Sequence, residues 1–202
     1  MIRNQPVEVF EVERKFLVDE ALSLPTREQL AAAGFTLHTE QPFQLTATYF
    51  DTPLLNLAAN KMALRRRTGG KDNGWHLKFK HAEGARELMW PDQIDMPQSL
   101  REQLTEHLGA ELANQIQPIA SIATYRATHI LSVSGEQVIE LVDDRVEGAN
   151  LLSQSTKQWR EWETELIGSA SPEVLDTLQS LLIDLGARHV TQTSKIQQTM
   201  QG

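Results

Sequence analysis

The sequence has 202 residues, of which 40% are hydrophobic, with 27 acidic side chains, 19 Lys or Arg side chains and no cysteine. This length suits one globular domain with a buried core, so a single domain over residues 1–202 is expected. The net charge of −8 argues against a general nucleic-acid or anionic-membrane surface. No signal-peptide pattern and no apolar run near the ~20 residues of a membrane span are found, so we expect a cytoplasmic protein without disulfides.

The first expected element is a strand, VEVFEVERKFLV, at residues 7–18. Successive side chains of a strand point to opposite faces, so Glu11, Glu13 and Lys15 share one face and apolar residues occupy the other. The ordinary interpretation is a half-buried strand whose charged face lies in water. Similar charged faces on later strands weaken that interpretation.

The remaining pattern alternates short strands with a few helices, and Gly-rich or Ser-Gly turns join neighbouring strands. Ser171, Pro172 and Gly186 bound the last helix, whose apolar stripe should cover the outside of the sheet. About eight strands with interspersed helices predict an α+β fold built on a large antiparallel sheet or barrel. The further strands are expected at residues 43–52, 62–68, 74–81, 85–91, 121–133, 136–148 and 157–168, and the helices at 23–35, 97–116 and 171–186.

Charged residues recur at alternate positions of these strands, and acidic strands are separate from basic ones. If the charged faces turn inward, one wall of the cavity carries carboxylates, which suit Mg²⁺ or Mn²⁺. The other wall carries Arg and Lys, which suit phosphate oxygens. A polyphosphate carrying metal ions satisfies both walls. The shared faces hold Arg65 with Arg67, Lys78 with Lys80, Glu140 with Asp144, and Glu161 with Glu163 and Glu165.

The motifs resemble the CYTH domain, also called the triphosphate tunnel metalloenzyme superfamily, and are closest to its thiamine triphosphatase-like and inorganic triphosphatase members. The E-x-E-x-K signature stands at Glu11, Glu13 and Lys15, and TYFDT, LRRR, WHLK, ELVDD, EWETE and a late Ser-Lys pair follow in family order. This resemblance implies a closed eight-stranded antiparallel β-barrel, a tunnel, with helices packed outside.

The resemblance also implies the site residues. Metal-ligand candidates for Mg²⁺ or Mn²⁺ are Glu11, Glu13, Asp144, Glu161, Glu163 and Glu165. Phosphate-binding candidates are Lys15, Arg65, Arg67, Lys78, Arg126 and Lys195, and the catalytic group is Lys15 with Glu11 and Glu13. Which two of the three late glutamates bind metal is open, with Glu163 favoured. Asp144 lies an even number of positions from Glu140 and so shares its face of the strand, which favours Asp144 over Asp143 as a metal ligand. The six histidines and four tryptophans are expected to have structural or surface roles.

The expected activity is metal-dependent hydrolysis of inorganic tripolyphosphate, thiamine triphosphate or both, by in-line attack on the terminal phosphorus. Mammalian thiamine triphosphatases carry a tryptophan immediately before LRRR, whereas Ala63 precedes Leu64 here, so tripolyphosphate should be hydrolysed at least as well. A class IV-type adenylate cyclase and a non-catalytic polyphosphate- or nucleotide-binding module are the alternatives. The expected partner is a small-molecule triphosphate, with no nucleic acid, membrane or obligate protein partner.

Overall fold

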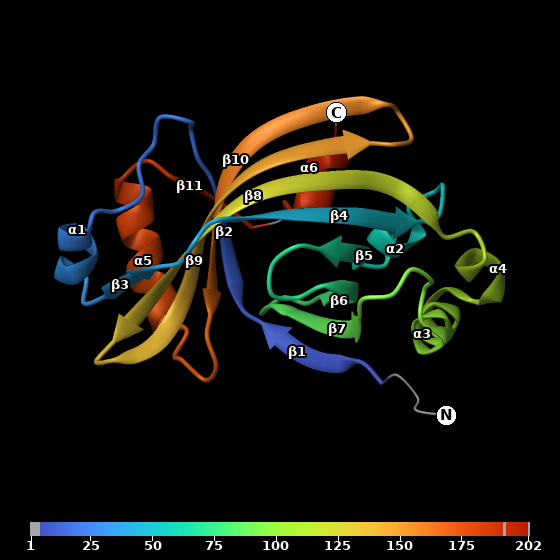
Figure 1. Cartoon of the computed structure of the whole chain (residues 1–202), viewed down its shortest axis with the longest axis horizontal. Helices are drawn as coiled ribbons and strands as arrows, with labels where there is room; N and C mark the ends of the chain where they lie inside the picture. The colour runs from blue at the N-terminus through green and yellow to red at the C-terminus, as the bar shows by residue number, and fades with distance from the viewer. Residues whose placement is uncertain (1–4, 192, 202) are drawn as a thin grey trace.

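The computed structural model describes residues 5–191 and 193–201, and the strands of this part of the chain form one antiparallel sheet (Figure 1). The strands are β1 (Val7–Glu11), β2 (Glu13–Leu17), β3 (Thr36–Thr39), β4 (Phe43–Asp51), β5 (Met62–Thr68), β6 (Gly74–Lys80), β7 (Ala85–Pro91), β8 (Gln117–Val133), β9 (Glu136–Asn150), β10 (Ser155–Leu166) and β11 (Arg188–Val190). Their order is β1-β7-β6-β5-β4-β8-β9-β10-β2-β11, and β3 pairs with β8. The predicted antiparallel, strand-rich α+β class is therefore confirmed.

The closed eight-stranded barrel is wrong, because the described part of the chain forms an eleven-stranded sheet with β1 and β11 at the ends of an open order. All eight expected strands are present, but the first one breaks at Val12. Its two halves diverge: β1 pairs with β7, and β2 pairs with β10. This break gives one strand more than the eight expected, and the short strands β3 and β11 bring the number in the described residues to eleven. Strands β8 to β10 arch over β5 to β7, and the β1–β2 segment crosses between these two halves (Figure 1).

Helices cover the outer, convex face of the sheet at two places. The helices are α1 (Arg27–Ala32), α2 (Asn56–Ala59), α3 (Gln98–Leu108), α4 (Ala110–Ala113), α5 (Glu173–Asp184) and α6 (Lys195–Met200). Leu175, Leu178 and Leu182 recur at helical spacing on α5 and pack with the fully buried Phe16 and Trp162. The predicted role of this helix is confirmed. None of the helices in residues 5–191 and 193–201 is long and apolar enough to cross a membrane.

A second outer core lies under α2 and α3. Leu64 and Leu77, from β5 and β6, are fully buried there with Leu100 and Leu104 of α3. Burying each such side chain stabilises the fold by roughly 1.5–3 kcal/mol. Since Leu64 lies between Arg65 and Ala63 in sequence, anchoring it on this side directs its charged neighbour to the opposite, concave face.

The β8–β9 hairpin turns at Ser134 and Gly135, as the sequence predicts. Their φ angles are 51° and 89°, and two positive angles in a two-residue loop suit the right-handed twist of the flanking strands. The pairing that starts at this turn shifts register between Leu131 and Ser132, and beyond the shift Arg126 of β8 faces Asp144 of β9. The turn and this irregularity together place two charged residues that are distant in sequence opposite each other.

Helix α6 departs from the expectation that helices pack only outside. Val146 and Gly148 alternate with Asp144 along β9, so all three share the concave face. Helix α6 lies on this face: Ile196 packs against the cluster that contains Val146, and a Cβ atom on Gly148 would stand 2.3 Å from the hydroxyl oxygen of Thr199 on α6. The concave face is thus apolar and helix-covered at one end, and charged at the other.

Candidate active site

The pairing register gathers charges on the concave face. Glu163 of β10 pairs with Lys15 of β2, and Glu161 of β10 pairs with Asp144 of β9. Asp144 in turn pairs with Arg126 of β8. Because directly paired residues of antiparallel strands point to the same side, these five side chains form one charged surface across four strands.

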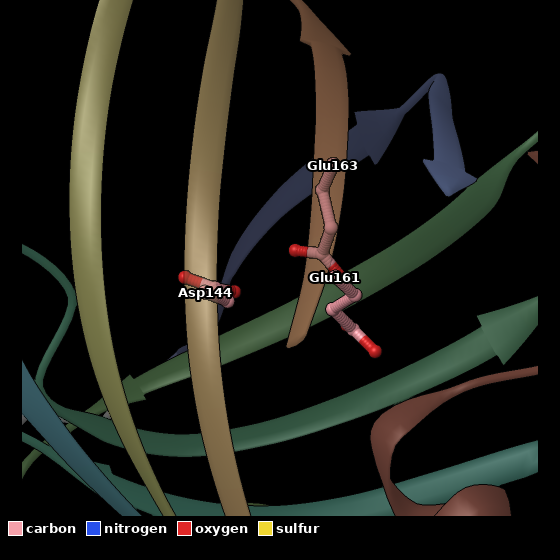
Figure 2. A group of neighbouring side chains, drawn as sticks. All are labelled: Asp144, Glu161 and Glu163. Carbon is pink, nitrogen blue, oxygen red and sulfur yellow. The ribbon is translucent and has the colours of Figure 1, made fainter. Parts of the chain in front are cut away.

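Three carboxylates on this surface form a compact cluster. Asp144 comes from β9, and Glu161 and Glu163 come from the neighbouring β10 (Figure 2). Each offers an oxygen, and these oxygens lie within 4.8 Å of one another. Asp144 and Glu161 are buried, with exposed fractions of 0% and 2%. Oxygen-only donors of this kind fit a hard divalent cation such as Mg²⁺ or Mn²⁺.

Basic side chains neutralise this cluster. Arg126 donates two hydrogen bonds to Asp144, of 2.8 and 2.6 Å, and a third of 3.0 Å to Glu163. The ammonium nitrogen of Lys195 lies 2.9 Å from an oxygen of Asp144, 2.6 Å from Glu161 and 2.9 Å from Glu163. Lys15 also forms an ion pair with Glu163. Three predicted phosphate-binding residues therefore lie in direct contact with three predicted metal ligands.

The electrostatics keep these groups ionised. Burial by itself would raise the pKa of Glu163, but the charges of Lys15 and Lys195 outweigh it and hold that pKa well below its usual value. Burial alone would lower the pKa of Lys195, and the charges of Asp144 and Glu161 reverse this effect and raise it well above normal. Glu163 and Lys195 are therefore expected to form an ion pair at neutral pH.

The E-x-E-x-K motif forms a second group beside the first. Lys78 of β6 lies 2.5 Å from Glu11 and 3.1 Å from Glu13, and Glu13 lies 3.3 Å from Lys15. These side chains are 15–20% exposed, so they do not face bulk solvent. Glu165 pairs with Glu13 in the ladder, and burial, followed by the charges of Glu11 and Glu13, raises its pKa to about 8. The six predicted metal ligands thus fall into two groups of three.

Arg65 and Arg67 line the other side of the concave face. Arg65 lies 3.2 Å from Glu87, and Arg67 lies 3.2 Å from Asp72. Burial, then repulsion from Arg65, lowers the pKa of Arg67 to about 10, which still leaves it charged at neutral pH. Arg67 and Arg126 line one pocket of about 50 Å³, so the side of the concave face that carries Arg65 and Arg67 adjoins the carboxylate cluster.

The structure also brings in residues that sequence reasoning missed. Glu87 is only 2% exposed and contacts both Arg65 and His76. Its signal was the single carboxylate in the strand ARELMWP. Trp159, expected to be a packing residue, donates its indole N–H to Glu161 at 2.6 Å, and Gln198 of α6 donates to the same oxygen at 3.0 Å. No sequence pattern pointed to Gln198.

Comparison with solved structures finds the same fold in proteins of distant sequence. A protein of Bacillus halodurans, provisionally assigned to the adenylate cyclases, matches with a TM-score of 0.61 and 21% identity over 95% of this chain and 97% of its own. A Hippeastrum protein, provisionally named an adenylyl cyclase and described as having a dominant triphosphatase activity, matches with a TM-score of 0.56 and 20% identity over 95% and 96%.

Sequence comparison identifies nearer relatives. Two uncharacterized proteins of Mycobacterium tuberculosis are each 36% identical over 207 residues, which cover 95% of this chain. The chain spans only 40% of the length of these relatives. The family model of the CYTH domain matches residues 10–200. The resemblance expected from the E-x-E-x-K motif is confirmed, and the chain belongs to the CYTH domain family.

Proposed function

We propose that this chain is a metal-dependent triphosphatase that hydrolyses inorganic tripolyphosphate at least as well as thiamine triphosphate. One observation carries the proposal: Asp144, Glu161 and Glu163 form an oxygen-donor cluster, and the cations around it are those suited to phosphate. Carboxylates and cations neutralise each other on one concave face. A polyphosphate with a divalent cation is complementary to both sets at once.

Binding would exchange partners within this network. Buried ion pairs carry a large desolvation cost, so removing one partner without replacing it is unfavourable. When a triphosphate binds, its oxygens replace the carboxylates as acceptors for Arg126, Lys15 and Lys195. Asp144 and Glu163 would then be free to hold a divalent cation, whose charge would replace that of their lost partners. The bound Mg²⁺ or Mn²⁺ would act as a Lewis acid on the phosphate oxygens and promote the attack of water.

The protein's own contribution is placement and charge stabilisation. Arg126 and Lys195 would hold the phosphate chain in line with the attacking water, and Lys15 would stabilise charge on the terminal group. Water bonds to the terminal phosphorus as the bridging P–O bond breaks, so tripolyphosphate gives pyrophosphate and orthophosphate. Glu11 and Glu13, which contact Lys78, remain predicted metal ligands and, with Lys15, the predicted catalytic group.

Two further observations support the choice of activity and substrate. A protein of the same fold is described as having a dominant triphosphatase activity, so the fold accommodates this chemistry. Ala63 pairs with Lys78 in the β5–β6 ladder, and its methyl group offers no ring for stacking on a thiamine moiety. Stacking on a thiamine moiety from this position is therefore lost.

The test is phosphate release from tripolyphosphate, thiamine triphosphate and ATP, each with Mg²⁺ and with Mn²⁺. Metal-dependent release from tripolyphosphate, with kcat/KM no lower than for thiamine triphosphate, supports the proposal. A clear preference for thiamine triphosphate contradicts the substrate assignment. Cyclic AMP and pyrophosphate from ATP would identify a cyclase instead. Tight binding without turnover under every metal would identify a binding module.

A further inference from the structure

Glu161 differs from the other two carboxylates of the cluster in the groups that hold it. One of its oxygens accepts from Lys195 at 2.6 Å. The other accepts from the indole N–H of Trp159 at 2.6 Å and from the side-chain amide of Gln198 at 3.0 Å. The carboxylate is 2% exposed, and Gln198 is 5% exposed. Both oxygens of Glu161 are therefore occupied, one of them by two neutral donors.

Asp144 and Glu163 have a different set of partners. Their ion pairs are with Arg126, Lys195 and Lys15, which are all cations that a phosphate chain would draw away. The neutral N–H donors on Glu161 gain far less from a phosphate anion than a full positive charge does. Withdrawing Glu161 from them would leave a largely buried amide without an acceptor, which is unfavourable. Glu161 would therefore keep its N–H donors when a phosphate binds, whereas Asp144 and Glu163 would exchange their cationic partners.

The amide on Glu161 belongs to α6, and this helix depends on such contacts for its position. It has only six residues, far fewer than an isolated helix needs to be stable in water. Ser194 and Gln197 form a capping box at its start, and Ile196 packs against the apolar end of the concave face. Gln198 supplies the buried polar contact between the helix and the sheet.

We propose that Glu161 is a positioning residue that latches α6 onto the concave face and so sets Lys195 in the site, while the divalent cation falls to Asp144 and Glu163. Lys195 is the first residue of α6. Its ammonium group reaches the carboxylates only while the helix is docked, because its backbone moves with the helix. The assignment of the cation rests on the proposed function, whereas the latch itself does not.

Hydrogen exchange tests the latch in the intact chain. Glu161→Gln removes the charge and one acceptor oxygen, and Gln198→Met removes only the donor amide at similar length. Both should raise amide exchange in peptides covering residues 193–201 by at least ~10-fold and leave β8 and β9 protected. Gln201→Met, at the exposed end of the same helix, is the matched control and should behave as wild type. Unchanged exchange in both test variants overturns the latch.

Mn²⁺ binding, followed by electron paramagnetic resonance, tests the assignment of the cation. Glu163→Gln should weaken Mn²⁺ binding by at least ~10-fold, as loss of a ligand does. Glu161→Gln should bind Mn²⁺ no more weakly than wild type, because it loosens Lys195 and removes no ligand. If Glu161→Gln loses Mn²⁺ affinity as Glu163→Gln does, Glu161 is a ligand and the assignment fails.

Kinetics test whether Glu161 acts through Lys195. If it does, Glu161→Gln combined with Lys195→Ala should lower kcat/KM no further than Lys195→Ala alone. Multiplying losses in the double variant would contradict the coupling. Wild-type protein that neither binds Mn²⁺ nor releases phosphate overturns the proposed function and the cation assignment together. In that case, amide hydrogen exchange in residues 193–201 still tests whether Glu161 holds α6 on the concave face.

Discussion

Arg126 of β8 and Asp144 of β9 are directly paired in the sheet and joined by two parallel hydrogen bonds of 2.8 and 2.6 Å. This fork-like geometry is what a guanidinium also forms with a phosphate group. The Asp144 carboxylate is 0% exposed, and under the proposed function a phosphate oxygen would replace it as the acceptor for Arg126. In this structure the charges of the two residues balance each other.

Replacing Arg126 should impair both stability and activity. Arg126→Ala leaves Asp144 buried with a weakened counter-charge, and loss of one partner of a buried ion pair costs about 3–5 kcal/mol of unfolding free energy. Arg126→Lys keeps the charge and loses the fork, so it should recover most of the stability but little of kcat/KM. Urea unfolding and steady-state kinetics measure the two effects. Full activity in Arg126→Lys would show that the paired geometry is not used on the substrate.

Asp144 and its neighbour Asp143 offer a matched comparison. Asp144→Asn should raise the metal concentration needed for half-maximal activity by at least ~10-fold, because one carboxylate ligand is lost. Asp143 instead pairs with Arg160 at 2.7 Å, on the opposite face of β9. Asp143→Asn should therefore leave the metal requirement unchanged and lower only the stability. Metal titrations of phosphate release distinguish the two, and equal shifts would reject the facial assignment.

Metal and triphosphate should stabilise the protein more together than separately. Metal alone would bind the carboxylates and leave the Arg and Lys side chains without counter-charges, and triphosphate alone would do the reverse. Both together satisfy each half, so the rise in Tm with Mn²⁺ and a non-hydrolysable tripolyphosphate analogue should exceed the sum of the separate rises. Differential scanning fluorimetry at fixed ionic strength measures this. Merely additive shifts would indicate independent sites.

Stability should depend on pH through His129. Burial is the main cause that lowers its pKa in the folded chain, and Asp143 only partly opposes it. The unfolded chain therefore takes up its proton first as pH falls, so the folded state loses stability below about pH 6.5. His129→Gln should lose less unfolding free energy than wild type between pH 7.5 and pH 5.5. Urea unfolding of both proteins isolates this term, because the carboxyl groups titrate in both, and parallel pH profiles would refute it.

Strand alternation was enough to assign faces. It placed Glu11, Glu13 and Lys15 together and chose Asp144 over Asp143, and the contacts of these residues agree with that choice. The prediction works because apolar neighbours such as Phe16 and Trp162 must be buried on the other side, which leaves the charged residues one direction. The family followed from the order of these short motifs.

Strand pairing and long-range packing decided the rest. Alternation cannot tell which strands adjoin, so only the register separates the group of Asp144, Glu161 and Glu163 from that of Glu11, Glu13 and Glu165. The break at Val12 sends β1 and β2 to different partner strands. It could not be predicted locally, because it depends on the curvature of the whole sheet. The contact of Gln198 with Glu161 joins residues 37 positions apart in sequence. Burial of apolar residues is a local periodic constraint, so the sequence pattern is enough to predict which side chains face inward. Which of these side chains meet depends on how distant strands pair and where a short helix docks, and no local pattern contains that information.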